Sequence, residues 1–456
     1  MNVRSVLTRN RLRATFVIVV VLSSAVIAYG SAHGRSTASE ADVPRAEPRD
    51  GHTVVTESGR YGTIVAYAPD GSLEYYDSSH TKYFDVDPVD SEATTVEYAA
   101  TDTIHTEGPT CRTPPCTRNV VERVNLSTGE TEEIYARYDH REKSGEWHDV
   151  DRIDDTHIVV ADIVADQVFV VDTETELVEW LWDAQSEFPV DGGGAYPTNW
   201  AHINDVEYVE RGEQAGRIVV SLRNQDQVVF LDRDEGLLEE WTLGAEDDYD
   251  VLYEQHNPDY IPEDEGGPAV LVADSENDRV QEFQREDGEW NRTWEWTDAR
   301  MEWPRDADRL PGGNTLVADT HGERILEIDP DGDIVWEVPV SHPYDVERLE
   351  TGDESTGGQS AAQLGLESRT VGAGNANDER SLLPIGTLRS LARDLLPHRL
   401  TNAAVYVSPV WMGASEFAAA IGIGLTGLAW ATLEVKWGLA AAGVRFRTPV
   451  YRQDDE

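Results

Sequence analysis

The chain has 456 residues, enough for one large domain or two to three ordinary ones. Asp and Glu number 87 against 37 Lys and Arg, so the formal net charge is −50. A surface of this charge repels itself in dilute salt, whereas molar salt shortens the Debye length to about 3 Å. The composition therefore predicts adaptation to concentrated salt, as in extreme halophiles, and argues against a nucleic-acid partner, which requires a basic surface.

The N-terminus combines positive charge with an apolar run. Four arginines within the first 13 residues precede the largely apolar residues 14–29. This order is typical of a signal sequence, and no convincing small-residue cleavage site follows. We predict a transmembrane signal anchor over residues 1–30, with a cleaved signal as the alternative. The arginines favour an N-terminus inside the cell and a following domain outside it.

A polar linker is expected over residues 31–53, and the main body over 54–350. The body holds the two cysteines of the chain, Cys111 and Cys116. In an exported protein they can form a local disulfide. Metal binding is less favoured, because no nearby Cys or His completes a ligand set, and two free thiols are a third interpretation.

The composition changes after the body. Residues 351–381 are rich in Gly, Ser, Asp and Glu, which is typical of a disordered linker, and 382–408 are expected to hold an amphipathic helix and a connector. Residues 409–433 are apolar except for Glu416 and long enough to span a bilayer. Basic residues beyond this span predict a cytoplasmic tail over 434–456. A buried core hairpin is the alternative for this region.

The body contains an internal repeat. Each copy has two β-rich runs around a short polar turn, with a short strand pattern before it and a Trp-containing one after it. Copies recur at intervals of roughly 50 residues, which is typical of propeller blades. The four clearest copies are 158–172, 218–232, 269–283 and 314–328.

Further copies complete the count. Two less regular ones lie upstream, at 62–77 and 95–139, and residues 344–349 repeat only the first strand. That last strand is suited to closing the ring beside a strand from the start of the chain. We therefore predict an all-β fold, a six-bladed β-propeller with flanking N- and C-terminal transmembrane helices.

The first strand of each blade borders the central channel of a propeller. Aligning these strands places five residues in one register: Asp149, Asp205, Asn257, Asp306 and Asp345. The residues before them are large and able to form hydrogen bonds: His148, Asn204, His256, Arg305 and Tyr344. Two positions further upstream, His202 matches His342. One mouth of the channel is thus expected to collect imidazoles, an amide and a guanidinium.

Arg223 departs from its repeat. The equivalent residues in other copies are Ile163, Ser275 and Thr320, so a single charge has been added here. Imidazoles with a guanidinium and an amide are suited to holding a tetrahedral oxyanion such as sulfate or phosphate.

Two other interpretations stand beside an anion site. Polar residues at blade entrances also hydrogen-bond neighbouring blades and then serve structure alone. His148, His202 and His256 could instead form a three-imidazole metal site, although a nearby Arg disfavours it because positive groups repel.

Several strings in the body resemble the PAPS-independent arylsulfate sulfotransferases: WHDVDRI, WAHINDVEYV, VVSLRNQDQV, EQHNPDYI and WPRDADRLPGGNTLVADT. The resemblance covers residues 140–350 well and 54–140 loosely. Its more specific part is the H-x-N pair, followed by a strand-end Arg and then by Q-H. It implies a six-bladed propeller that transfers sulfuryl groups between phenols through a sulfohistidine, with no cofactor and no metal.

The resemblance also implies residue roles. His256 would be the nucleophile, and His148 the acid/base and oxyanion partner near the phenolic oxygen. His202 and Asn204 would bind sulfate oxygens. Arg223 and Arg305 would add positive charge to the sulfate site.

The sequence departs from the family in three ways. It leaves no room for an N-terminal β-sandwich, it adds a second apolar span, and it has Pro258 two residues after His256. The expected partners are an aryl sulfate donor and a phenolic or other hydroxyl acceptor, with the propeller membrane-anchored and facing outside. The runner-up is a non-catalytic extracellular propeller that binds a ligand or an envelope partner. A different propeller enzyme, such as a metal-assisted lyase or hydrolase, is the third class.

Overall fold

The computed structural model describes residues 3–33, 39–59, 62–89, 94–140, 145–371, 409, 411–412 and 414–442. They form two units, a helical one with both ends of the chain and a β-rich one between them. The amphipathic helix predicted over 382–408 lies outside the described residues.

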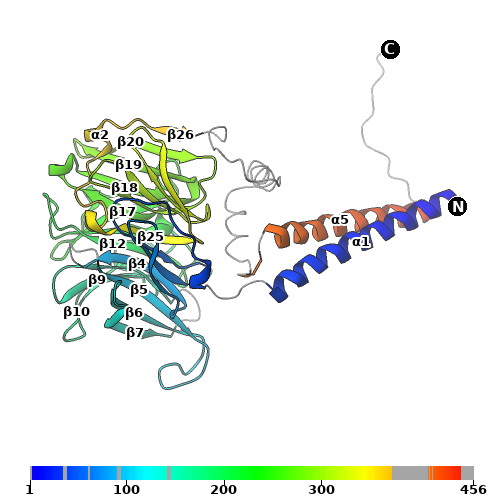
Figure 1. Cartoon of the computed structure of the whole chain (residues 1–456), viewed down its shortest axis with the longest axis horizontal. Helices are drawn as coiled ribbons and strands as arrows, with labels where there is room; N and C mark the ends of the chain where they lie inside the picture. Colours follow the sequence, from blue (N-terminus) through cyan, green and yellow to red (C-terminus); the bar gives the residue numbers. More distant parts are fainter. Residues whose placement is uncertain are drawn as a thin grey trace, which may run out of the picture. The chain divides into compact units, whose positions relative to one another are not determined.

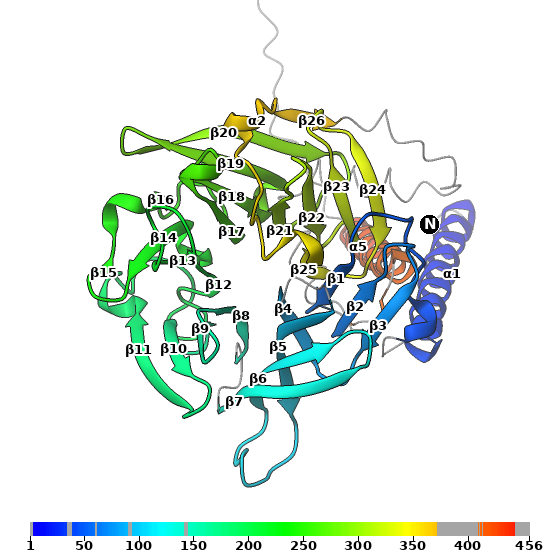
Figure 2. The ribbon, with the colours of Figure 1, turned by 60° about the vertical axis from the view of Figure 1, so that its left-hand side comes forward.

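Six sheets of four or five strands are arranged around a ring and confirm the predicted six-bladed propeller (Figures 1 and 2). Blade 1 consists of β25 (Pro343–Arg348), β1 (Thr53–Glu57), β2 (Thr63–Tyr67) and β3 (Leu73–Asp77). Blade 2 consists of β4 (Lys82–Pro88), β5 (Thr95–Ile104), β6 (Cys116–Asn125) and β7 (Glu130–Asp139). Blade 3 consists of β8 (Trp147–Arg152), β9 (His157–Asp162), β10 (Gln167–Asp172) and β11 (Leu177–Asp183).

The other three blades follow the same plan. Blade 4 consists of β12 (Ile203–Tyr208), β13 (Ile218–Leu222), β14 (Gln227–Asp232) and two short strands on β14, β15 (Gly236–Leu237) and β16 (Leu243–Gly244). Blade 5 consists of β17 (His256–Ile261), β18 (Ala269–Asp274), β19 (Arg279–Glu286), β20 (Glu289–Asp298) and β26 (Arg369–Val371). Blade 6 consists of β21 (Pro304–Arg309), β22 (Thr315–Asp319), β23 (Arg324–Ile328) and β24 (Ile334–Pro339).

Blade 1 is built from both ends of the propeller sequence. β25 pairs antiparallel with β1, with Glu347 opposite Val54 and Val346 opposite Val55. This pairing confirms the closing strand predicted at 344–349. It joins the last blade to the first and leaves no open edge in the ring.

Apolar packing holds each blade against the next. Six clusters of buried side chains each draw on two adjacent blades, so one cluster fills each junction. Between blades 3 and 4, for example, Val159 and Val168 pack with Val206 and Val220. The central strands are buried on both faces, which explains why they read as continuous runs of Val, Ile and Leu.

The outer edge of blade 4 differs from the predicted Trp-containing strand. A 3₁₀ turn, η4 (Glu239–Trp241), separates β15 from β16. Trp241 packs on Phe230, and the guanidinium of Arg285 lies 4.2 Å from its ring. These contacts with blades 4 and 5 replace a regular outer strand.

Carboxylates on the innermost strands link neighbouring blades. Each accepts a hydrogen bond from a backbone N–H of the next inner strand, which satisfies a group that no ladder partner reaches. The bonds join Asp345 to Val86 N (2.7 Å), Asp85 to Val150 N (3.2 Å), Asp149 to Val206 N (2.7 Å) and Asp306 to Val346 N (3.1 Å). We call these four bonds the inter-blade latches.

Blade 5 breaks this pattern because of one residue. Pro258 lies opposite Val272 in the ladder, as Val206 lies opposite Val220, and proline has no N–H to donate. Asp205, which would accept that bond, has Oδ2 buried without a partner in the described part of the chain. A bond from Tyr260 N to Glu207 at 2.7 Å links blades 4 and 5 instead.

The disordered linker predicted over 351–381 is wrong for residues 351–371. Ser355 donates to Asp259 and accepts from Arg309 N at 2.7 Å, and β26 pairs in parallel with β20. Composition suggested disorder because the segment has few apolar residues. Its order comes from polar bonds to the innermost strands and from the packing of Ala361, Leu366 and Val371 on the core between blades 5 and 6, which composition does not reveal. Residues 372–381 lie outside the described part.

The helical unit contains α1 (Val3–His33) and α5 (Ala414–Ala441), which pack side by side (Figure 1). Both are long and apolar enough to cross a membrane. Arg13 donates to Glu434 at 2.6 Å and its guanidinium lies 5.5 Å from the Trp437 ring. The start of α1 thus meets the end of α5, so the helices are antiparallel.

The second span differs in extent from the predicted 409–433. The helix continues to Ala441, so Glu434 belongs to it rather than to a tail over 434–456. Glu416 lies in the first helical turn and not in mid-span.

In the propeller, a disulfide joins Cys111 and Cys116, one of the three interpretations left open by the sequence.

The channel carboxylates predict a pH-dependent stability. Burial raises the pKa of Asp345 and of Asp353 to about 7. A carboxyl with a raised folded-state pKa stabilises the fold below its unfolded pKa of about 3.9, and this contribution is lost as pH rises through about 7. We expect the melting temperature to fall between about pH 4 and pH 8 at constant ionic strength, with a loss on the order of 4 kcal/mol for one such group. Asp345→Asn should flatten the profile, and a rise in stability across this range would contradict the interpretation.

Candidate active site

The predicted site residues meet at one end of the inner strands. Tyr344 is central to them, because its ring centroid lies 5.7 Å from that of His148 and 6.3 Å from that of His256. The guanidinium of Arg305 lies 4.8 Å from the same ring. We call the following six side chains, one from each inner strand, the site ring: Phe84, His148, Asn204, His256, Arg305 and Tyr344.

The sixth member of this ring departs from expectation. The repeat predicted a hydrogen-bonding side chain in every copy, whereas β4 supplies Phe84. Its ring stacks on His148 with centroids 4.6 Å apart. Blade 2 therefore contributes an apolar wall to the site, and that wall fixes the plane of one imidazole.

His256 is held in one tautomer. Its Nδ1 lies 2.8 Å from Ser275 Oγ and 3.1 Å from the carbonyl oxygen of Glu254. Ser275 donates its own proton to the carbonyl of Pro304 at 2.6 Å, so towards His256 it acts as an acceptor. Both partners of Nδ1 accept, and therefore Nδ1 carries the proton and Nε2 the lone pair.

The three site histidines are neutral. Burial lowers the pKa of His256 well below its ordinary value, and Arg305 and Arg223 lower it further. Burial also lowers the pKa of His148 and of His202, with Arg223 contributing in both cases. A neutral imidazole at pH 7 is a competent nucleophile, whereas an imidazolium is not.

His148 and His202 are in contact. Their ring centroids are 4.9 Å apart in an edge-to-face arrangement. His202 Nδ1 lies against the amide oxygen of Asn199, whereas His148 Nδ1 is buried without a hydrogen-bond partner among the described residues. An unpartnered buried nitrogen at this position is suited to a bound ligand.

Arg223 replaces a structural hydroxyl. Its counterparts Ser275 and Thr320 each donate to a carbonyl of the next inner strand, at 2.6 and 2.7 Å. In blade 4 that bond comes from Asn204, whose Nδ2 donates to Gln255 O at 2.9 Å. The Arg223 guanidinium therefore does not make this carbonyl bond and pairs instead with Glu254, which precedes β17 of blade 5.

The guanidinium of Arg223 lies beside the site ring. It pairs with Glu254, lies 5.8 Å from the Trp303 ring, and has its Nε buried without a partner among the described residues. The guanidinium of Arg305 lies 4.9 Å from the same ring and donates to Ser58 at 2.9 Å. Two guanidinium groups therefore lie near one aromatic side chain, Trp303, and Glu254 pairs with that of Arg223.

The backbone before the site ring adopts one unusual conformation in four blades. The residue two positions upstream has φ between 49° and 54° in each: His202, Glu254, Trp303 and His342. This left-handed region is uncommon for such side chains and requires support from its surroundings. Turn carboxylates provide that support, since Asp226 accepts from Glu254 N at 3.0 Å and Asp278 from Trp303 N at 2.9 Å.

Sequence reasoning missed several residues of this site. Glu254 and Trp303 lie two positions before ring members, as His202 and His342 do, so the alignment carried a signal for them. Ser275 was noted only as the counterpart of Arg223. Lys82 bonds Glu146 at 2.8 Å and lies 5.8 Å from the Phe84 ring. Nothing in the repeat indicated that it belongs to this site.

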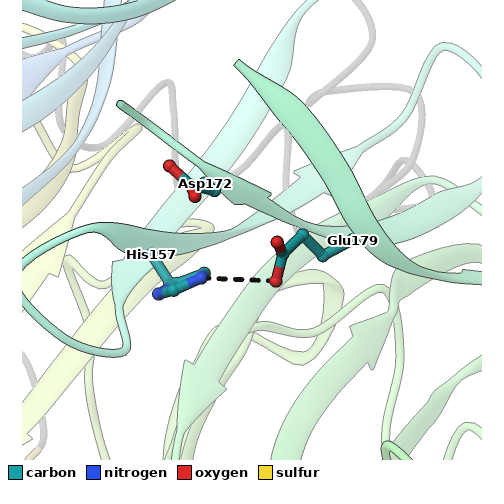
Figure 3. Close-up of side chains that lie close together, drawn as sticks. All are labelled: His157, Asp172 and Glu179. Atoms are coloured by element: carbon teal, nitrogen blue, oxygen red, sulfur yellow. Dashed lines mark ion pairs between the residues drawn. The ribbon is translucent and has the colours of Figure 1, made fainter. Parts of the chain in front are cut away.

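A second group of polar side chains lies on blade 3. Ligand atoms of His157, Asp172 and Glu179 lie within 4.8 Å of one another (Figure 3). His157 Nε2 is 3.4 Å from Glu179, while its Nδ1 is 2.8 Å from Asp154. Both imidazole nitrogens thus have carboxylate partners, which is the pattern of a protonated histidine in surface ion pairs.

The tautomer of His256 is open to a direct test. Ser275→Ala removes one acceptor at Nδ1, and we expect the ring to populate both neutral tautomers. Ser275→Thr should keep the wild-type state, because Thr320 occupies the equivalent place in blade 6. Nitrogen-15 NMR of labelled histidine distinguishes the two forms, and an unchanged spectrum for Ser275→Ala would show that the hydroxyl has no such role.

Comparison with known proteins bears on the same region. Residues 148–293 match the model of the arylsulfotransferase (ASST) family, a stretch that begins at His148 and includes Arg223 and His256. No curated protein matches the sequence.

Solved structures with a similar fold are distant in sequence. A protein of unknown function from Bacteroides caccae is 12% identical, with a TM-score of 0.44, covering 66% of this chain and 98% of that one. The periplasmic gluconolactonase PpgL of Pseudomonas aeruginosa is 13% identical, with a TM-score of 0.40, covering 65% and 98%. A chain of a nidogen–laminin complex is 12% identical, with a TM-score of 0.42, covering 66% and 99%. The family match therefore suggests a transferase, and the solved structures add nothing about the reaction.

Proposed function

We propose that the protein is an arylsulfate sulfotransferase that moves a sulfuryl group from an aryl sulfate ester to a phenolic or other hydroxyl acceptor. The observation that carries the proposal is His256, a buried neutral imidazole held with its lone pair on Nε2. It lies beside two guanidinium groups that suit an anionic substrate. The family match over residues 148–293 supports the same reaction class.

The first step forms a covalent intermediate. His256 Nε2 attacks the sulfur, the bond between sulfur and the aryl oxygen breaks, and the bonding electrons leave with the phenolate. The ring then carries positive charge, and the proton stays on Nδ1, which donates hydrogen bonds to Ser275 Oγ and Glu254 O. The acceptors that fix the tautomer thus also stabilise the sulfohistidine.

His148 exchanges the proton with the phenolic oxygen. Positive charge from Lys82, Arg305 and Arg223 lowers its pKa in addition to burial. A sulfate ester brings negative charge that offsets these cations, so we propose that His148 gains a proton as the donor binds and gives it to the departing phenolate. In the second step it removes the proton of the acceptor hydroxyl, whose oxygen attacks sulfur and releases His256.

Unused hydrogen-bond donors supply the sulfate site. Arg223 Nε is buried without a partner among the described residues, and we propose that it donates to a sulfate oxygen of the bound ester. Trp303, Tyr344 and Phe84 provide aromatic surface around the imidazoles, which fits an aryl group.

A non-catalytic propeller remains the second candidate. Asn204 uses its amide nitrogen on Gln255 O, and Arg223 is paired with Glu254. These bonds show that two of the predicted sulfate-binding residues also hold the blades together. A binding module would keep them for that reason alone.

We further propose that the two helices anchor the propeller outside the cell. The antiparallel pairing puts the start of α1 and the end of α5 at one end of the helix pair, where Arg9 and Arg13 meet Trp437. Positive residues favour the cytoplasmic side. Residues 34–413 connect the opposite ends of the helices and would lie outside.

The reaction is tested with 4-nitrophenyl sulfate and phenol in molar salt. We expect release of coloured nitrophenol, at least a thousandfold loss in His256→Ala, and little change in His342→Ala. Mass spectrometry of the donor-treated protein should show one added sulfo group on the peptide that contains His256. Absence of turnover with several phenols, together with no added mass, would favour the binding module. Turnover lost on chelation would favour a metal-assisted enzyme.

The topology is tested by labelling single cysteines in intact cells. A cysteine introduced at exposed Glu289 should react with a membrane-impermeant maleimide, and one placed at Asp455 should react only after lysis. The reverse pattern would place the propeller inside and exclude an extracellular enzyme.

A further inference from the structure

A cavity of about 500 Å³ opens at the end of the inner strands away from the histidines. It is bordered by the ends of β4, β8 and β12 and by the segment that follows β25. Eight acidic residues line it: Asp87, Asp151, Glu207, Glu210, Glu265, Glu350, Asp353 and Glu354. Its two arginines already have carboxylate partners, Arg152 with Glu97 and Arg211 with Glu265.

Three carboxylates hold an oxygen for which the described residues supply no partner. These atoms are Asp308 Oδ2, Glu347 Oε2 and Asp353 Oδ1. One of the three residues, Asp353, lines the cavity. The other two lie on β21 and β25 three residues after the site ring, the position that the lining residues Asp87, Asp151 and Glu207 occupy on β4, β8 and β12. Asp308 is 2% exposed and Glu347 is 3% exposed. Asp353 lines the cavity and acts electrostatically on both of the others, so the three form one group.

Of the nearby cations, Arg348 acts electrostatically on Asp308, but both adjacent arginines are paired with other carboxylates. Arg348 follows Glu347 in sequence but pairs with Glu327 at 3.1 Å. Arg309 follows Asp308 but pairs with Glu282 at 2.9 Å. Further carboxylates, Asp345 and Asp259, lie within electrostatic range of Asp308. Buried unpaired carboxylates require protons or a cation.

We propose that Asp308, Glu347 and Asp353, with the acidic lining of the cavity, bind a hydrated divalent cation, Ca²⁺ or Mg²⁺. The donors are oxygen atoms only, which is the ligand set of these hard cations and not of zinc or copper. Among the described residues, only the trio of His157, Asp172 and Glu179 brings three ligand atoms within 4.8 Å of one another. The ion in the channel is therefore held partly through water, for which the cavity has room.

The cation has a defined structural consequence. Asp308 belongs to β21, Glu347 to β25, and Asp353 to the segment after the closing strand. Glu354 N already donates to Glu347 at 3.0 Å, so this segment is attached at one point. A cation shared by the three carboxylates joins blade 6, blade 1 and the segment at the end of the ring where the chain closes.

The test uses the full chain in detergent at neutral pH and constant ionic strength. Ca²⁺ and Mg²⁺ are titrated separately by calorimetry, and Tb³⁺ is titrated by luminescence, since Tyr208 and Tyr260 line the cavity and can sensitise it. We expect saturable binding and a melting temperature that rises with cation concentration. The double variant Asp308→Asn/Glu347→Gln should bind each of these cations at least about tenfold more weakly than the wild type.

A matched control separates this site from the surface trio. Asp172→Asn/Glu179→Gln should bind the cation as the wild type does. Removing repulsive charge from Asp308 and Glu347 should not unfold the ring, so the double variant should melt no lower than wild type without cation. The proposal is overturned if the wild type binds neither cation at millimolar concentration, if the double variant binds normally, or if the surface variant loses binding. Binding of 1,4-diaminobutane in place of either metal would equally overturn it and identify an organic cation site.

Discussion

The structure depends on bonds between a carboxylate on one inner strand and a backbone N–H on the next. A propeller brings six inner strands around one axis, where each strand is paired on one side only and backbone groups would be left without partners. Asp85, Asp149, Asp306 and Asp345 meet this requirement at four junctions. The same geometry crowds acidic groups together, so that blade-to-blade bonding and electrostatic repulsion arise from the same side chains.

At the proposed active site, positive rather than negative charge surrounds the inner strands. At the histidine end, burial combines with Arg223 and Arg305 to keep His256 neutral. Hydrogen bonds to Ser275 and Glu254 O then determine which nitrogen is free. The channel therefore has a cationic end suited to an anionic substrate and an acidic end suited to a cation, separated by the length of one inner strand.

Much of the fold could be predicted from the sequence. The spacing of the hairpins determines the blade count, and the lone repeat of the first strand at 344–349 indicates the closing strand. The shared register of Asp149, Asp205 and Asp306 also brings the site ring together. These features are periodic, and periodicity is visible in a single sequence.

Other features depend on contacts between distant residues and could not be predicted. Nothing in the repeat shows that Glu254 pairs with Arg223, or that Phe84 rather than a polar residue completes the site ring. Residues 351–371 have the composition of a linker, and only the bonds of Ser355 to β17 and β21 reveal their order. Pro258 was noted as an irregularity, yet its effect, an orphaned oxygen on Asp205, requires the ladder register to be seen.

The pairing of β25 with β1 has a consequence for biogenesis. Tyr344, the residue at the centre of the site, lies on the strand that is synthesised last among the inner six. The first blade therefore acquires its innermost strand only when the propeller sequence is almost complete. Until then β1 has an unpaired edge and the site ring lacks Tyr344, so assembly of the site is a late event in folding.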